Sequence, residues 1–338
     1  MKAPLLTGLL TCVSALALAD STQPSPTDTI QPYGPPSAVT PPPAPWFTGP
    51  LIAPIGAIIP YGDFEIETYL YCTTDTGTYN SHWGSVSAQN NFFSLNPKWL
   101  CFFGLTSWMD INITPQFFYN TTAGQGAVRF GDLPIALDFQ LLDPSATPYF
   151  PGIKFTIQET FPTEAFENLN PNKLLTDDTG AGAFGTTFNL VFYKVYHLVG
   201  HCFLSSTISA AYTINTSVHV HGFNTYGGGY GTSGTVLPGN TFQGIVSFEL
   251  SLSQNWALAL DNVYTHVDIS KFYGNVGVNA AGAPATVGVP SSEQISFAPA
   301  IEYAFSSNLG IIAGAWVTGW GRNSPIFRSG VVNLTYTY

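Results

Sequence analysis

A two-residue period runs through most of this chain and is clearest at its end. In the last ten residues, SGVVNLTYTY, apolar side chains occupy every second position: Val332, Leu334, Tyr336 and Tyr338. Successive side chains of a β-strand point to opposite faces, so this alternation predicts a strand with one apolar and one mostly polar face.

Similar alternation recurs in about twelve segments of the chain. We expect strands at residues 61–72, 92–103, 108–120, 129–142, 152–161, 182–194, 202–215, 242–252, 256–269, 294–305, 309–320 and 329–338. Short turns alternate with long polar loops, which we place at residues 73–91, 162–179, 216–241 and 270–293. This arrangement predicts an antiparallel up-and-down β-barrel with both termini on one side. Ten or fourteen strands stay open because three segments alternate less clearly, and the second half of 256–269 suggests a bulge.

The composition narrows the class of barrel. Only 9% of the residues are charged, whereas 45% are hydrophobic and 14% are aromatic. Soluble domains carry about 25% charged residues. The most apolar run after the N-terminus, residues 51–60, is short and broken by prolines, so no spanning helix is expected. We therefore predict an all-β transmembrane barrel whose outer wall faces lipid. A secreted β-sandwich or β-helix is the alternative, although such folds usually carry more surface charge.

The first sixty residues predict two further segments. Lys2, an apolar stretch at 5–19 and small residues ending at Ala19 fit a secretory signal peptide over residues 1–19, cleaved near Ala19. A lipid-modified Cys12 is a rival interpretation. Residues 20–60 are rich in proline, which cannot donate to a ladder, so we expect a disordered periplasmic arm. That arm could be a linker, an anchor to another envelope component or a partial plug. Residues 61–338 form the barrel.

The aromatic C-terminus adds an expectation about assembly and location. A final aromatic residue after alternating apolar positions resembles the C-terminal signal that the bacterial barrel-assembly machinery reads. We therefore expect Gly330–Tyr338 to be recognised by that machinery, and the barrel to lie among outer-membrane lipids. The terminal strand should close the barrel by pairing antiparallel with the strand at 61–72.

Charged side chains on the polar faces are the candidate functional residues. A charge facing lipid near the midplane costs several kcal/mol, so we expect these groups to face the lumen. The candidates are Asp63, Glu65, Glu67, Asp110, Asp132, Asp138, Lys154, Lys194, Glu249, Asp261 and Glu302. A lumen lined mainly by carboxylates favours cations over anions. In the alternative interpretation the barrel is filled, and Lys154 and Lys194 pair with the acids in a structural network.

Other kinds of chemistry find little support. The formal charge of −11 argues against nucleic acid as a partner. There is no G-x-S-x-G motif, and the nearest His–Ser pair, His82 and Ser85, lies in a polar loop. His219 and His221 could share one side of a strand, but no acidic or cysteine partner lies close in sequence. Cys72, Cys101 and Cys202 have no metal-binding spacing, although one pair could be oxidised. We expect neither an enzyme nor a cofactor.

Three short motifs resemble one family. They are Phe103-Gly104-Leu105-Thr106 with the following Trp108–Ile111, Phe130-Gly131-Asp132-Leu133, and Phe161-Pro162-Thr163 with Thr179-Gly180-Ala181-Gly182. They are similar to motifs of the outer-membrane transporter-like group linked to the MetA pathway of phenol degradation. The resemblance implies an outer-membrane barrel that acts as a channel or transporter, and it leaves the substrate class open.

Two functions remain from the sequence. The first is a channel for passive passage of small solutes, with an acidic lumen that favours neutral or cationic species. The second is a non-conducting structural or adhesive surface protein whose long loops meet a host cell or an envelope partner.

Overall fold

The computed structural model describes residues 45–145, 149–200 and 202–338. The signal peptide predicted at 1–19 and the proline-rich residues 20–44 lie outside the described residues, so their predictions stay open. Within the described ranges, no helix is long and apolar enough to cross a bilayer.

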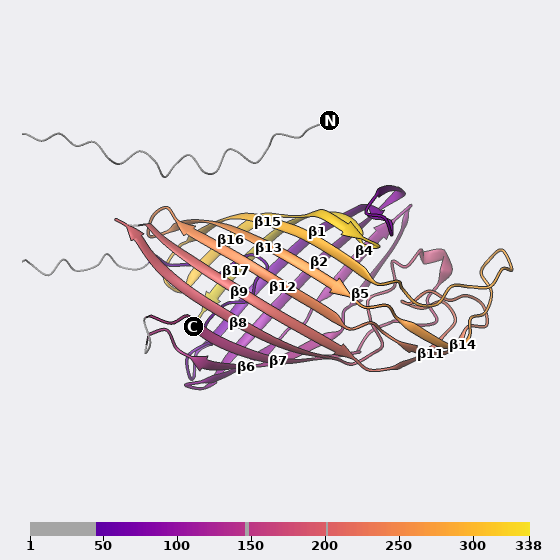
Figure 1. Cartoon of the computed structure of the whole chain (residues 1–338), viewed down its shortest axis with the longest axis horizontal. Helices are drawn as coiled ribbons and strands as arrows, with labels where there is room; N and C mark the ends of the chain where they lie inside the picture. Colours follow the sequence, from indigo (N-terminus) through magenta and orange to yellow (C-terminus); the bar gives the residue numbers. More distant parts are fainter. Residues whose placement is uncertain (1–44, 146–148, 201) are drawn as a thin grey trace, which may run out of the picture. The chain divides into compact units, whose positions relative to one another are not determined.

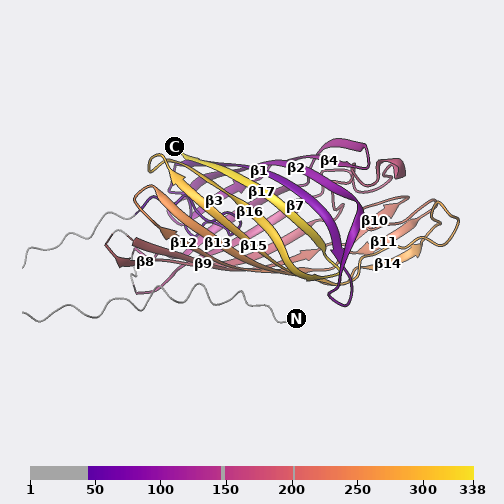
Figure 2. The same ribbon diagram turned by 90° about the horizontal axis from the view of Figure 1, so that it is seen from above.

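The described chain forms a closed antiparallel barrel of twelve wall strands, as predicted (Figures 1 and 2). The wall consists of β1 (Phe64–Tyr79), β2 (Ser85–Thr106), β3 (Met109–Ile113), β4 (Phe117–Thr122), β5 (Gln125–Phe130), β6 (Leu133–Leu142), β7 (Gly152–Phe161), β8 (Gly185–Val199), β9 (Cys202–Asn215), β12 (Thr241–Ser251), β13 (Trp256–Val267), β15 (Ser292–Ala304), β16 (Leu309–Arg322) and β17 (Pro325–Thr337). Two pairs of these, β3 with β4 and β5 with β6, each make up one wall strand.

The first and last strands close the barrel. β1 pairs antiparallel with both β2 and β17, and Glu65 lies opposite Thr337. The amide of Tyr338 donates to the carbonyl of Phe64 at 2.7 Å. The predicted pairing of the terminal strand is therefore confirmed, and no wall edge is left open at this seam.

Breaks in two wall strands have local causes. The expected strand at 108–120 is interrupted between β3 and β4 at Pro115, which has no amide proton for the ladder. The expected strand at 129–142 is interrupted at Gly131. Only glycine fits this position, because an added Cβ would lie 2.6 Å from the Phe118 ring.

Side chains alternate along the wall strands as predicted. On β13, Leu258 and Leu260 face outward with 44% and 39% of their surface exposed, whereas Ala259 and Asp261 are buried. The bulge expected in the second half of this strand is wrong, because β13 keeps an unbroken register with both neighbours. Val263 stays on the inner face because it packs against an apolar segment inside the barrel.

The long connections are more ordered than expected. Most of the loop predicted at 73–91 is strand, because β1 and β2 extend to a tight turn at 80–84. The loops predicted at 216–241 and 270–293 contain β10 (Val218–His221), β11 (Ser233–Leu237) and β14 (Lys271–Asn275), which form a separate three-stranded sheet. Val218, Val220 and Val236 give this sheet a small core. We call this end of the barrel the loop end, and the end with the short turns the turn end (Figure 1).

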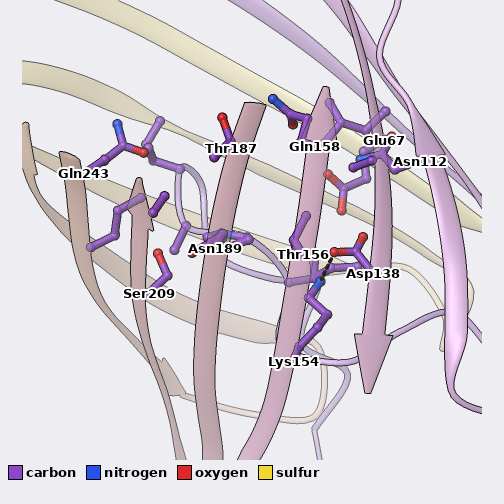
Figure 3. Close-up of a pocket in the computed structure, with 18 of the residues that line it drawn as sticks. Glu67, Asn112, Asp138, Lys154, Thr156, Gln158, Thr187, Asn189, Ser209 and Gln243 are labelled. Atoms are coloured by element: carbon purple, nitrogen blue, oxygen red, sulfur yellow. Dashed lines mark hydrogen bonds and ion pairs between the residues drawn. The ribbon is translucent and has the colours of Figure 1, made fainter. Parts of the chain in front are cut away.

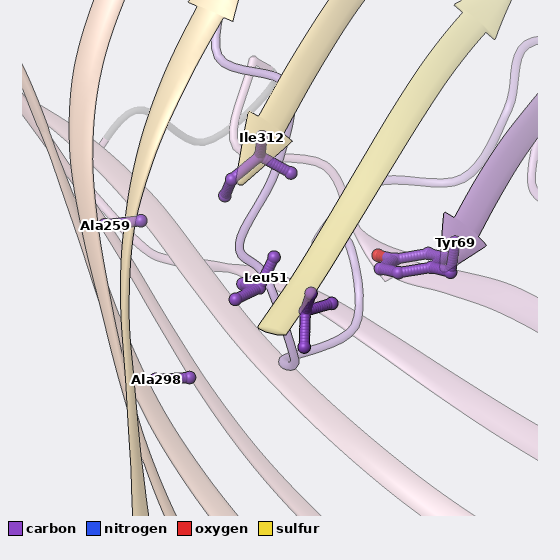
Figure 4. Close-up of a cluster of buried hydrophobic side chains, with 6 residues drawn as sticks. Leu51, Tyr69, Ala259, Ala298 and Ile312 are labelled. Atoms are coloured by element: carbon purple, nitrogen blue, oxygen red, sulfur yellow. The ribbon is translucent and has the colours of Figure 1, made fainter. Parts of the chain in front are cut away.

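Residues 45–60, here called the inner segment, lie inside the barrel. Leu51 is fully buried and packs against side chains of the inner wall (Figure 4): Tyr69, Ala259, Ala298, Ile312 and Val331. The sequence predicts a disordered arm up to residue 60, and this is wrong for the described part. The apolar side chains of 51–59 explain the difference, because burial in the lumen removes them from water.

Candidate functional site

Three wall carboxylates bind backbone amides of the inner segment. The amide of Ile52 donates to Oδ2 of Asp261 at 2.6 Å. Glu302 Oε2 accepts from the amide of Thr48 at 3.0 Å and from its hydroxyl at 3.1 Å. Near the end of the segment, the amide of Ile59 donates to Asp110 Oδ2 at 2.7 Å. Hydrogen bonds to carboxylates are about twice as strong as neutral ones, so these contacts hold the segment at its start, middle and end.

A buried lysine offsets the charge of two facing acids. Asp110 and Asp138 lie directly opposite each other on β3 and β6. Lys154 Nζ lies 3.8 Å from Asp138 Oδ1, and this lysine is only 2% exposed. The hydroxyl of Thr156 also donates to Asp138. Like charges directly opposite each other destabilise a sheet, so the lysine compensates a cross-strand repulsion.

Two cavities lie inside the barrel, and the inner segment lines both. A loop-side cavity of about 410 Å³ has residues 51–55 on its wall (Figure 3). A turn-side cavity of about 380 Å³ is lined by 46–50 and 55–60. The segment therefore lies between them and interrupts the path along the lumen.

The predicted acids divide between these cavities. Glu67, Asp138 and Lys154 line the loop-side cavity. Glu65 and Glu249 line the turn-side cavity, whose lining contains no lysine, arginine or histidine among the described residues. Their carboxylates accept from the hydroxyls of Thr337 and Ser205 at 2.6 and 2.8 Å, respectively.

Three predicted residues lie elsewhere. Asp63 precedes β1 and is partly exposed. Asp132 holds the loop at 162–184, because its carboxylate accepts from the amides of Ala181 and Glu164 at 2.7 and 3.2 Å. Lys194 does not face the lumen as expected: on β8 the inner face carries Val191 and Tyr193, and the Lys194 ammonium donates to the carbonyl of Tyr149 at 2.8 Å.

Sequence reasoning missed one lumen lysine. Lys98 lines the loop-side cavity, and its ammonium lies 5.3 and 5.0 Å from the ring centres of Tyr69 and Tyr71. The signal was present, because Asn96 and Lys98 alternate with apolar neighbours in β2. Because this strand is unusually long, the sequence did not show clearly which of its residues face inward.

The histidines and cysteines show no metal site. His221 Nδ1 lies 3.0 Å from Glu167 Oε2, so this histidine has an acidic partner that is distant in sequence. Among the described residues, no group of three or more His, Cys, Asp or Glu side chains could hold a metal ion. Within the described ranges, Cys72, Cys101 and Cys202 are free thiols.

Burial changes the ionisation of one acid in the loop at 162–184. It raises the pKa of Asp178 to about 6, and a hydrogen bond from Thr225 opposes this shift only in part. The order of this loop therefore responds to pH.

Comparisons with known proteins agree with the barrel. No protein-family profile and no curated protein sequence matches the chain. Among solved structures, an outer membrane channel from Pseudomonas putida F1 is similar with a TM-score of 0.62 and 13% identity, covering 84% of this chain and 98% of that one. The translocator domain of the autotransporter NalP from Neisseria meningitidis has a TM-score of 0.43 and 12% identity over 81% and 88% of the two chains. The fold is that of the outer-membrane β-barrels. Membership of the MetA-pathway group stays a prediction.

Proposed function

We propose that this protein is an outer-membrane channel for passive passage of small neutral or cationic solutes. The observation that carries the proposal is the pair of cavities on either side of the inner segment. Side-chain acceptors and the carbonyl of Gln254 in a turn hold that segment, rather than a β-ladder, so it can leave without breaking the wall. Opening the path then requires displacement of residues 45–60 and no change in the barrel.

The charge of the lumen supports the preference for neutral and cationic solutes. Among the charged side chains of the described wall strands that are buried or line the two cavities, seven carboxylates stand against two lysines, Lys98 and Lys154. The carboxylates are Glu65, Glu67, Asp110, Asp138, Glu249, Asp261 and Glu302. Such a lumen raises the local concentration of cations and disfavours anions. The solved channel of similar fold also bears the description of an outer membrane channel.

Location and assembly belong to the same proposal. An apolar outer wall fits outer-membrane lipid, and a signal peptide over residues 1–19 would direct export. We also propose that Gly330–Tyr338 is the segment that the barrel-assembly machinery recognises, since it forms the strand that closes the barrel. No catalytic step is part of this function.

A structural or adhesive role is the second candidate, and the ordered loop sheet favours it. Tyr230 and Tyr273 are 57% and 60% exposed at the loop end, where a partner on another cell could contact them. In this case the filled lumen would have no transport role.

Conductance across planar bilayers separates the two functions. The channel predicts discrete cation-selective openings that become more frequent in Asp261→Ala, which frees the middle of the inner segment. Glu65→Gln with Glu67→Gln should reduce cation selectivity, whereas Glu164→Gln in the loop is the matched control. Electrical silence of the wild type and of Asp261→Ala, together with loss of cell binding on loop deletion, would establish the adhesive role instead.

A further inference from the structure

One side of the loop-side cavity is lined mainly by polar, uncharged side chains. Inward side chains at one level follow neighbouring strands in register, from Asn112 on β3 through Gln158 on β7 and Thr187 on β8 to Thr213 on β9. A second level contains Thr156, Asn189 and, beyond Ala211, Gln243. The amides and hydroxyls therefore form two adjacent rows on one side of the lumen (Figure 3).

Two amides in these rows line the cavity, and one of them has an unpaired oxygen. The Asn189 Oδ1 atom is buried and accepts no hydrogen bond from the described residues. The Gln243 side chain is partly exposed and lines the same cavity. Unsatisfied buried polar atoms are rare in native proteins and cost about 1–3 kcal/mol each, so the unpaired oxygen of Asn189 indicates a missing partner.

An aromatic surface lies across the lumen from these amides. Tyr69 and Tyr71 project from β1, and their rings stack at 5.6 Å with an interplanar angle of 18°. In the closed sheet order, β8 and β12 lie on the far side of the barrel from β1. A ligand in the cavity thus meets aromatic rings on one side and amides on the other.

The charges of the cavity balance. Its ionisable acids and bases are Glu67, Asp138, Lys98 and Lys154, two of each sign. Asp138 and Lys154 already pair with each other. The cavity therefore offers no net attraction to a charged ligand, unlike the turn-side cavity, whose charged groups are acidic.

From this arrangement we propose that the loop-side cavity is a binding site for a neutral polyhydroxylated solute of the sugar class. Hydroxyl groups both donate and accept, so they can pair with Asn189 and Gln243, while the apolar face of a sugar ring stacks on tyrosine. A volume of about 410 Å³ lies within the range of about 300–1,000 Å³ typical of small-molecule sites. This inference rests on the proposed channel, for which it names a solute class.

Saturation-transfer NMR titration of the full-length protein in detergent micelles tests the site without any need for conduction. The probes are glucose, glucosamine and glucuronate, which share a pyranose ring and differ in charge. We expect saturable binding that is strongest for glucose. Asn189→Leu and Gln243→Leu should each weaken it by about five- to tenfold, and Tyr69→Leu should weaken it further. Gln125→Leu, at the exposed start of β5, is the matched control and should leave binding unchanged.

The outcomes distinguish this inference from the proposed function. Heat-modifiable migration on gels confirms that each variant is a folded barrel before titration. Conductance without saturable glucose binding, or binding equal in wild type and both amide variants, would overturn the sugar site and leave the channel intact. Tighter binding of glucuronate or glucosamine would overturn the neutral class. Glucose binding that depends on the amides, in a barrel that never conducts, would support the site and remove the channel.

Discussion

The amide of Ile52 lies 2.6 Å from Oδ2 of Asp261, and this contact fastens the middle of the inner segment to β13. Because the carboxylate is buried, its hydrogen bond is worth more than a neutral one, about 1.5–3 kcal/mol. We expect Asp261→Ala to reduce hydrogen-exchange protection of the amides at 48–55 by about ten- to a hundredfold, while the wall strands keep theirs. Asp63→Ala, at a partly exposed site, is the control. Unchanged protection in Asp261→Ala would mean that the packing of Leu51 and the contacts of Thr48 and Ile59 hold the segment without Asp261.

Lys154 should contribute strongly to the stability of the barrel. With only 2% of its surface exposed, it offsets the charges of Asp138 and the facing Asp110. Lys154→Met leaves these acids uncompensated and should lower the free energy of unfolding by about 3–5 kcal/mol. Urea unfolding in lipid vesicles measures the loss, with Lys271→Met on the exposed β14 as the control. Adding Asp138→Asn to Lys154→Met should restore much of the stability. Failure of this rescue would contradict the electrostatic account.

Stability of the loop at 162–184 should depend on pH. Burial raises the pKa of Asp178 to about 6, above the value of about 3.9 for a free aspartate. The ordered loop thus binds the proton more tightly than the open loop does, so its order is greatest below about pH 4 and declines up to about pH 6. Spin-label mobility at an exposed loop site, Leu174→Cys, should rise over this interval and level off above it. Asp178→Asn should flatten most of the change, and an opposite trend with pH would refute the assignment.

The sequence predicted the wall because the wall follows a local rule. Successive residues of a wall strand face lipid and lumen in turn, so they alternate in polarity. Glu65, Asp138 and Glu302 could therefore be placed on the inner face from their neighbours alone. Lys194 departed from this rule: it lies on the outer face, where its ammonium donates to the carbonyl of Tyr149. Val263 departed from it because the lumen beside it contains apolar side chains rather than water. The course of the inner segment was not predictable from local pattern: its partners Asp110, Asp261 and Glu302 lie 51 to 254 residues away in the chain.

The outward leucines provide a test of the membrane-facing wall. Leu260 lies in the middle of β13 with 39% of its surface exposed. In lipid vesicles, Leu260→Lys should lower the free energy of unfolding by about 2–4 kcal/mol, because the charge enters hydrocarbon. Leu237→Lys, equally exposed on β11 of the loop sheet, should change it by less than about 0.5 kcal/mol. Equal effects at the two sites would contradict a membrane position for this part of the wall.

Substitution of Tyr338 should affect the assembly of the barrel but not its stability. Its side chain is 82% exposed, although its backbone completes the pairing with Phe64. Because Tyr338→Ala removes little packing, the refolded variant should unfold within about 0.5 kcal/mol of the wild type. If the assembly machinery recognises the terminal strand through this ring, the amount of folded barrel in the outer membrane should nevertheless fall severalfold in cells. Tyr61→Ala, 74% exposed beside the start of β1, is the matched control and should assemble normally. Normal assembly of Tyr338→Ala would show that the aromatic terminus is not the recognised feature, whereas a large loss of refolded stability would assign the ring a structural role.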